Sequence, residues 1–338
     1  MMAVVTDQLH RPLTDLRISV TDRCNFRCVY CMPKEIFGPS FTFLPRQQLL
    51  TFEEIERLVR IFQTLGVRKI RLTGGEPLLR QGLETLVERL AAIPGIEDLA
   101  MTTNGSLLTL DRARRLKAAG LRRLTISLDS LDERTFRAVN EVNFPVSRVL
   151  DAISHAEAAG LTPVKINMVV KRGTNDKDIL AMAHRFRFTG HILRFIEFMD
   201  VGTTNGWRLD EVIPARQIIS LINAAWPLES VPPDRPGDVA RRYRYRDGGG
   251  EIGVISSVTE PFCRHCSRAR LSPEGQLYLC LFAPDGYDLR RLLREGFSDQ
   301  EIREAILRQW RGRRVRYSEE RLQLTESRPK VEMFRIGG

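Results

Sequence analysis

Cys24-Asn25-Phe26-Arg27-Cys28-Val29-Tyr30-Cys31 places three thiols within eight residues of the chain. We expect the backbone to loop here and to bring the three thiols together. They would then converge on something compact: a zinc ion, a disulfide or an iron–sulfur cluster.

The length and composition narrow this choice. The chain has 338 residues, 43% of them hydrophobic, which is enough for a large α/β barrel with an appendage. It contains no run of the roughly 18–20 apolar residues that cross a membrane, and residues 1–16 lack the apolar core of a secretion signal. We therefore expect a cytoplasmic protein with no membrane partner. In that reducing compartment the six cysteines favour metal or catalytic roles over disulfides.

Strand-like and helix-like segments alternate after residue 15. Thr51 and Glu54 give the first helix a capping-box signature. The expected strands are 16–20, 69–72, 97–101, 123–127, 164–170 and 192–198. Six βα units in succession indicate a parallel sheet with right-handed crossovers. We predict an α/β fold, an incomplete (β/α)6-type TIM barrel with a C-terminal α+β extension.

The chain is expected to divide into consecutive regions. Residues 1–14 form an N-terminal arm, 15–226 the partial barrel, 227–250 a connector and 251–338 the C-terminal region. The connector is rich in Pro, Gly and Arg, which is typical of a surface loop. Asn175 is expected to cap the helix that precedes the sixth strand.

Polar or Gly-rich segments follow most of the predicted strands. These segments are 24–31, 74–76, 102–105, 127–129 and 197–200. In βα barrels the functional groups lie at the C-terminal ends of the strands. We therefore expect the active site at that end.

Zinc is the alternative to an iron–sulfur cluster at Cys24, Cys28 and Cys31. Structural zinc sites usually have four ligands, whereas this loop offers three cysteines and no nearby histidine. Thiolates also hold iron–sulfur clusters, and three of them leave one iron of a cubane open. That open iron could bind a substrate or a cofactor.

A second set, Cys263, Cys266 and Cys280, again offers three thiols. Zinc is more credible here, because a CxxC pair beside a hairpin is a common zinc knuckle. His265 lies inside that pair and would point away from a metal bound by its neighbours. We favour a second cubane, which the C-terminal extension would carry.

Arginines follow this second set directly. In an extended segment Arg268 and Arg270 lie on one face, and guanidinium groups suit phosphate oxygens. Arg17, Arg71 and Lys165 would add positive charge from inside the barrel. Isolated charges are rarely buried unpaired, so an anionic ligand is expected, in keeping with the net charge of +10.

The first cysteine loop, together with Thr73-Gly74-Gly75-Glu76-Pro77, resembles the radical S-adenosylmethionine superfamily. The resemblance implies a 4Fe-4S cluster whose open iron binds S-adenosylmethionine, and reduction then releases a 5′-deoxyadenosyl radical. It implies cofactor contacts at Tyr30, Gly75, Ser127 and Met199. The glycines would let the backbone approach the methionyl end, and Glu76 or adjacent polar groups could accept from its ammonium.

The second cysteine set and its arginines narrow the resemblance to the MoaA family, the GTP 3′,8-cyclases of molybdenum cofactor biosynthesis. The similarity extends from Leu13 to the C-terminus and includes the segments 194–200 and 263–270 and the final Gly337-Gly338. It implies two 4Fe-4S clusters held by the six cysteines. It also implies GTP contacts at Arg17, Arg71, Thr102, Lys165, Arg268 and Arg270, with Lys69 and Arg194 near the triphosphate.

The resemblance further implies the reaction. The radical removes the hydrogen at C3′ of GTP, the C3′ radical adds to C8 of guanine, and Arg268 or Arg270 serves as a catalytic residue when the final radical is quenched. The product passes to cyclic pyranopterin monophosphate synthase (MoaC). An external electron donor, a homodimer and a Gly337-Gly338 tail inside the active site are also implied.

Two other functions compete with this one. A radical enzyme with an auxiliary cluster could modify a peptide or RNA, although such peptide-modifying enzymes usually have more C-terminal cysteines. A zinc-stapled nucleic-acid-binding protein would explain the charge, but its basic segments lack interleaved aromatic residues. We therefore expect no nucleic-acid partner.

Overall fold

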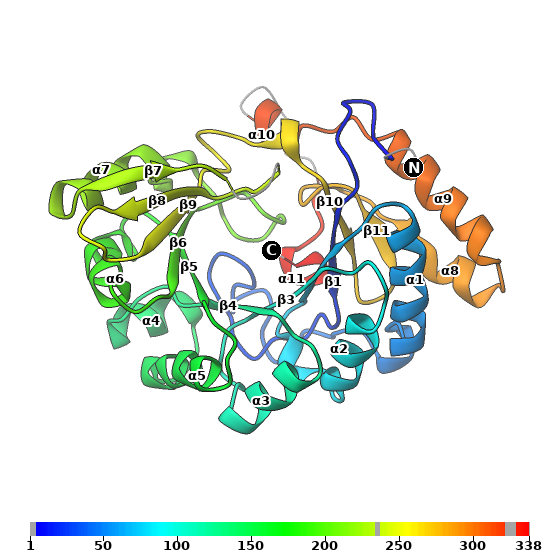
Figure 1. Cartoon of the computed structure of the whole chain (residues 1–338), viewed down its shortest axis with the longest axis horizontal. Helices are drawn as coiled ribbons and strands as arrows, with labels where there is room; N and C mark the ends of the chain where they lie inside the picture. Colours follow the sequence, from blue (N-terminus) through cyan, green and yellow to red (C-terminus); the bar gives the residue numbers. More distant parts are fainter. Residues whose placement is uncertain (1–4, 234–236, 322–328, 338) are drawn as a thin grey trace.

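A computed structural model describes residues 5–233, 237–321 and 329–337, with elements labelled as in Figure 1. Six strands lie side by side and parallel, in chain order. They are β1 (Asp15–Ser19), β2 (Lys69–Thr73), β3 (Asp98–Thr103), β4 (Arg123–Ser127), β5 (Lys165–Val170) and β6 (Ile192–Glu197). The predicted α/β fold is confirmed, and the curved sheet is an incomplete barrel (Figure 1).

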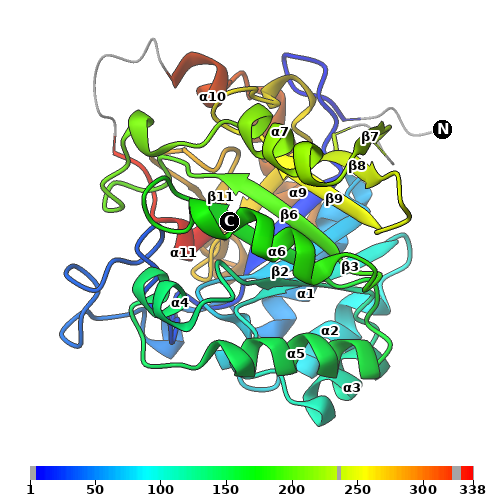
Figure 2. The same ribbon diagram turned by 90° about the vertical axis from the view of Figure 1, so that its left-hand side faces the viewer.

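Helices cover the outer face of this sheet (Figures 1 and 2). They are α1 (Phe52–Thr64), α2 (Leu83–Ala91), α3 (Leu110–Ala118), α4 (Glu133–Asn140), α5 (Val146–Ala158) and α6 (Ile179–Phe186). The capping box at α1 is confirmed, because Thr51 and Glu54 each accept a hydrogen bond from the other's backbone N–H.

Further strands extend both edges of the sheet. β9 (Glu251–Ile255) pairs parallel with β6, and β10 (Arg268–Leu271) pairs parallel with β1. Antiparallel strands then continue outward on each side. These are β7 (Leu228–Val231), β8 (Arg241–Tyr245), β11 (Gln276–Tyr278) and β12 (Tyr287–Asp288).

The surface connector expected at 227–250 is therefore wrong, because this segment contains β7 and β8. Its described Pro and Gly residues flank these strands, whereas Tyr245 is buried against Trp226. The other boundaries between the predicted regions stay predictions.

Two helices and one cap also differ from expectation. α4 and α7 (Ala215–Ala225) were not predicted. Asn175 occupies the N-cap position of a short 3-10 helix (Asp176–Asp178) that leads into α6, but its side chain makes no capping hydrogen bond. Its buried amide donates instead to the carbonyl oxygens of Asp129 and Val169. The remaining helices are α8 (Leu289–Arg294), α9 (Asp299–Arg311), α10 (Tyr317–Glu320) and α11 (Met333–Ile336).

The strands separate an apolar outer face from a polar inner face. Leu16 and Ile18 of β1 are fully buried in the main hydrophobic core, whereas Asp15 and Arg17 alternate with them and line an internal cavity. Among the described residues, no helix is both long and apolar enough to cross a membrane.

Candidate active site

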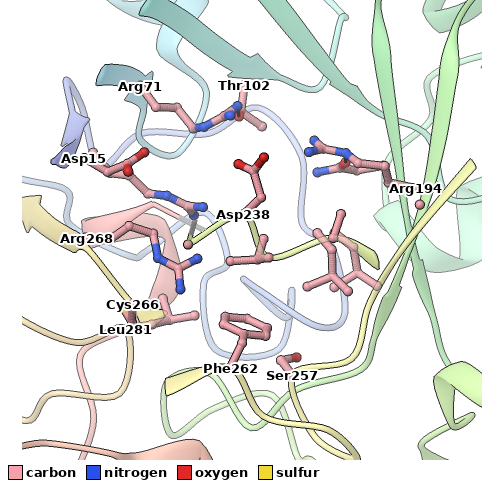
Figure 3. A pocket seen from close by; sticks show the side chains of 18 of the residues that line it. Asp15, Arg71, Thr102, Arg194, Asp238, Ser257, Phe262, Cys266, Arg268 and Leu281 are labelled. Carbon is pink, nitrogen blue, oxygen red and sulfur yellow. Dashed lines mark hydrogen bonds between the residues drawn. The ribbon is translucent and has the colours of Figure 1, made fainter. Parts of the chain in front are cut away.

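A cavity of about 230 Å³ lies on the inner face of the sheet. All six predicted GTP contacts line it, together with the whole second cysteine set. These residues are Arg17, Arg71, Thr102, Lys165, Arg268, Arg270, Cys263, Cys266 and Cys280. Figure 3 shows Arg71, Arg194 and Arg268 converging on this space from different strands.

Strand register explains this convergence. Arg17 of β1 pairs with Arg71 of β2 on one side and with Arg270 of β10 on the other. Because paired residues point to the same face, three guanidinium groups form one row across the sheet. Lys165 of β5 enters from the opposite side of the cavity, beyond Thr125 of β4.

The cations in this row repel one another. Burial, followed by the charges of Arg270, Arg268 and Arg71, lowers the pKa of Arg17 well below its usual value. Burial and the charge of Arg123 lower the pKa of Arg71 to about 10. An anionic ligand would reduce the free-energy cost of burying these two cations, because it would supply the missing opposite charge.

Arg123, Asn167 and Asp238 line the cavity and were not among the predicted sites. Arg123 forms an ion pair with Asp98, and Arg194 donates from Nε to Asn167 Oδ1 at 2.9 Å. Asp238 points into the cavity toward Arg194, with its carboxylate 3.9 Å from Lys69 Nζ (Figure 3). The alternating pattern of the strands could have found Arg123 and Asn167, since each has the inward-facing parity of its strand.

Buried arginines hold the second cysteine set in place. Arg313 donates to the carbonyl oxygen of Cys266 at 2.7 Å and to its sulfur at 3.0 Å, while Arg11 donates to the Cys263 carbonyl at 2.9 Å. Asp7 accepts from both arginines, so the N-terminal arm is part of this scaffold. Burial raises the pKa of Cys266, but the charges of Arg268 and Arg313 outweigh it and lower that pKa to about 6.

The first cysteine set lies in the loop after β1. Cys28 Sγ lies 3.0 Å from Asn140 Oδ1, and the loop backbone is hydrogen-bonded to the end of α4. Burial raises the pKa of Cys24 to about 12 and also raises the pKa values of Cys28 and Cys31. Repulsion between neighbouring thiolates raises the pKa values of Cys28 and Cys31 further. Within the described ranges, no three His, Cys, Asp or Glu side chains are grouped as the ligands of a single metal ion. The six cysteine assignments therefore stay predictions.

The predicted cofactor contacts fall around this loop. Tyr30 donates from its hydroxyl to Asp129 at 2.9 Å, Ser127 ends β4, and Met199 lines the cavity. Gly75 has a local structural reason in addition to the expected contact with the cofactor. A Cβ there would collide with the backbone of Arg23, so the glycine lets the turn pack against the cysteine loop.

The expected role of Glu76 toward an ammonium group stays a prediction, but the structure shows a local structural role for its carboxylate. Its buried carboxylate accepts from Leu78 N at 2.9 Å, Thr103 Oγ1 at 2.7 Å and Asn104 N at 2.7 Å. These bonds tie the Gly-Gly-Glu turn to the end of β3. Glu76 is therefore occupied in holding the turn.

The end of the chain enters the cavity region. Arg270 donates to the carbonyl oxygens of Ile336 and Gly337, and a Cβ at Gly337 would overlap the side chain of Thr73. α11 lies inside the curve of the sheet (Figure 1). Gly338 lies outside the described residues.

Comparisons with known proteins identify the chain's relatives. A family model described as the radical SAM superfamily matches residues 18–186, and one described as Molybdenum Cofactor Synthesis C matches residues 191–319. The GTP 3′,8-cyclase of Acidothermus cellulolyticus is 56% identical over 319 residues, 93% of this chain and 88% of its relative. This chain belongs to the GTP 3′,8-cyclase family. The GTP 3′,8-cyclase of Staphylococcus haemolyticus is 46% identical over 342 residues, which span both proteins completely.

Solved structures share the fold of this GTP 3′,8-cyclase family member. Streptococcus suis SuiB bound to S-adenosylmethionine aligns with a TM-score of 0.61 at 14% identity, over 87% of this chain and 68% of that one. SuiB bound to its precursor peptide SuiA aligns with the same score at 13% identity, over 90% and 66%. At this identity the likeness concerns the fold alone.

Proposed function

We propose that this protein is a lyase that converts GTP to (8S)-3′,8-cyclo-7,8-dihydroguanosine 5′-triphosphate, the first step of molybdenum cofactor biosynthesis. The observation that carries the proposal is the cavity, where a row of repelling cations meets three thiols. A nucleoside triphosphate supplies the anionic groups that the cations lack. Sequence identities of 56% and 46% to two GTP 3′,8-cyclases, over at least 93% of this chain, support the same substrate.

Membership of the radical SAM superfamily implies S-adenosylmethionine and one 4Fe-4S cluster. Cys24, Cys28 and Cys31 fit that cluster, because three buried thiols on one loop gain a stabilising positive charge when they bind iron. When bound, the pair would supply the 5′-deoxyadenosyl radical that removes H3′ of GTP. C3′ would then bond to C8, and one electron from the external donor and one proton would complete the dihydro product. We assign Tyr30, Gly75, Ser127 and Met199 to S-adenosylmethionine.

A second 4Fe-4S cluster is proposed at Cys263, Cys266 and Cys280. The donor set fits it, because all three thiols line the cavity and Arg313 donates to the sulfur of Cys266. Hydrogen bonds to ligand sulfurs are among the features that tune such clusters. A guanine ring at this end of the cavity would place the triphosphate toward the cations of the strands.

The side chains of the cavity would bind and orient GTP. Arg17, Arg71, Lys165 and Thr102 face the space where the triphosphate and ribose would lie, with Lys69 and Arg194 beside them. Arg268 and Arg270 border the second cysteine set and are the proposed catalytic residues. By fixing C3′ and keeping water out, this lining would restrict the radical to one hydrogen.

The direct test is product analysis after anaerobic incubation with GTP, S-adenosylmethionine and a reductant. We expect cyclised GTP and 5′-deoxyadenosine in equal amounts. Consumption of a peptide or RNA in place of GTP would overturn the proposal and favour the competing radical enzyme. Cleavage of S-adenosylmethionine without any cyclised GTP would also contradict it.

We also propose two partners for this reaction, a downstream enzyme and an electron donor. The cyclised product would pass to cyclic pyranopterin monophosphate synthase (MoaC), and an external donor would reduce the protein. A homodimer and a cytoplasmic location stay predictions.

GTP binding is expected to weaken as the pH rises above about 8. Burial and the charges of Arg194, Arg123 and Arg71 lower the pKa of Lys165 to about 8. A bound triphosphate favours the protonated amine, so binding takes up a proton above that pH and weakens by at most about tenfold per pH unit. Calorimetric titrations between about pH 7 and pH 9 measure the slope. Lys165→Arg is the control, and an equal slope in both proteins would assign the titration to another group.

A further inference from the structure

The loop that follows β6 is fastened to the C-terminal tail through Asp200. This buried carboxylate accepts from Arg321 Nε at 2.7 Å, from the Tyr317 hydroxyl at 2.5 Å and from Lys330 Nζ at 2.7 Å. Lys330 also donates to the Asp200 carbonyl oxygen at 2.9 Å. A single carboxylate therefore joins the loop to both α10 and the tail.

Glu332 makes a second junction with the same loop, from the tail's side. Its Oε1 accepts from Thr203 N at 3.0 Å and Thr203 Oγ1 at 2.9 Å, and its Oε2 accepts from Thr204 Oγ1 at 2.9 Å. Gly202 leaves the space for this carboxylate, because a Cβ there would overlap it. We name Asp200 and Glu332 together the tail anchor.

Beyond the tail anchor, the chain runs directly to the cavity. The Phe334 ring packs against Met32 and Phe37 of the loop that carries the first cysteines, with its centroid 5.0 Å from that of Phe37. Three residues later, the carbonyl oxygen of Gly337 accepts from Arg270. The place at which the tail is anchored therefore sets where Gly337 meets the cavity arginine.

The loop is also tied to residues assigned to S-adenosylmethionine. Asn205 donates from its amide to the carbonyl oxygen of Met199 at 2.9 Å and to that of Tyr30 at 3.4 Å. One short segment thus contacts the first cysteine loop on one side and the tail on the other. It can fix the distance between the proposed radical source and the tail.

We propose that Asp200 and Glu332 are positioning residues for GTP cyclisation, which hold the tail so that its last carbonyl groups orient Arg270 in the cavity. The inference rests on the proposed function. Neither carboxylate lines the cavity, so their effect on GTP passes through the tail. Their loss should spare the binding and cleavage of S-adenosylmethionine and reduce the fraction of radicals that end in product.

The test compares Glu332→Ala with Glu320→Ala, a control on α10 whose carboxylate lies 3.9 Å from Arg316 Nε. We expect Glu332→Ala to lower kcat for cyclisation about 10- to 100-fold, as for a misplaced reacting group. S-adenosylmethionine cleavage should change less than about twofold, so the ratio of 5′-deoxyadenosine to product rises. Glu332→Gln keeps one oxygen acceptor and should recover part of the coupling.

Hydrogen exchange of the tail gives an independent readout. Residues 329–337 should exchange faster in Glu332→Ala than in the wild type or in Glu320→Ala, with or without GTP turnover. Unchanged exchange would show that Glu332 does not hold the tail. Faster exchange with an unchanged ratio of 5′-deoxyadenosine to product would show that the position of the tail does not affect how many radicals end in product. Either result overturns the inference. Absence of cyclised GTP from the wild-type protein would instead overturn the proposed function.

Discussion

A Cys28→Ala variant is expected to cleave no S-adenosylmethionine, whereas a Cys263→Ala variant is expected to keep cleaving it and to form no cyclised GTP. Each change removes a ligand from a different cysteine set. Because both sets offer only three thiols, neither has a spare ligand. The iron content after anaerobic reconstitution should fall from about eight to about four per chain in either variant.

The two variants distinguish the roles of the cysteine sets. Both are expected to form no product, but only Cys28→Ala is expected to lose the cleavage of S-adenosylmethionine. His265→Ala is the matched control for the second set, because this exposed histidine lies inside the CxxC pair and is not a proposed ligand. It should keep the full iron content. Cys263→Ala with unchanged iron would refute a second cluster, and zinc lost from His265→Ala would favour a zinc knuckle.

The inner face of the barrel could be predicted largely from strand parity. Arg17, Arg71 and Lys165 stand at strand positions that alternate with buried apolar residues, so their inward direction follows from the period of two. The same rule places Arg123 and Asn167 in the cavity. They were missed because the prediction followed the family resemblance and did not continue the pattern along each strand.

Contacts between distant parts of the chain could not be predicted in this way. Nothing near Asp200 in the sequence points to Lys330, and nothing near Asp7 points to Arg313. The prediction of a connector failed for a related reason: the edge of β9 offers hydrogen-bond partners to β8, and β8 in turn pairs with β7. Local Pro and Gly signals carry no information about such an edge.

The Gly74-Gly75 turn shows that a correct motif can have an additional structural reason. The sequence suggested that these glycines admit the cofactor. In the structure, their missing side chains let the turn approach Thr21 and Arg23, and Glu76 then fixes the turn to β3. The motif therefore packs against the start of the cysteine loop, in addition to any contact that it makes with the cofactor.

The second large effect is expected from Arg17→Met, which should weaken GTP binding roughly 10- to 100-fold and yet stabilise the GTP-free protein. Hydrogen bonds to charged groups contribute about 1.5–3 kcal/mol each, which corresponds to this loss of affinity. The opposite sign for stability follows from the lowered pKa of Arg17. Burial and the charges of Arg270, Arg268 and Arg71 all disfavour its cation, and methionine keeps the apolar stem without the charge.

Both effects can be measured on the same reconstituted protein. Titration calorimetry gives the dissociation constant for GTP, and thermal unfolding without GTP gives the change in melting temperature. Arg114→Met is the control, because Arg114 is exposed on α3 and outside the cavity. Lower stability in Arg17→Met would show that Arg17 has a structural partner, and unchanged affinity would remove it from the GTP site. A gain in stability with a loss of affinity would mean that the close approach of the cations destabilises the GTP-free protein and is needed to bind the triphosphate.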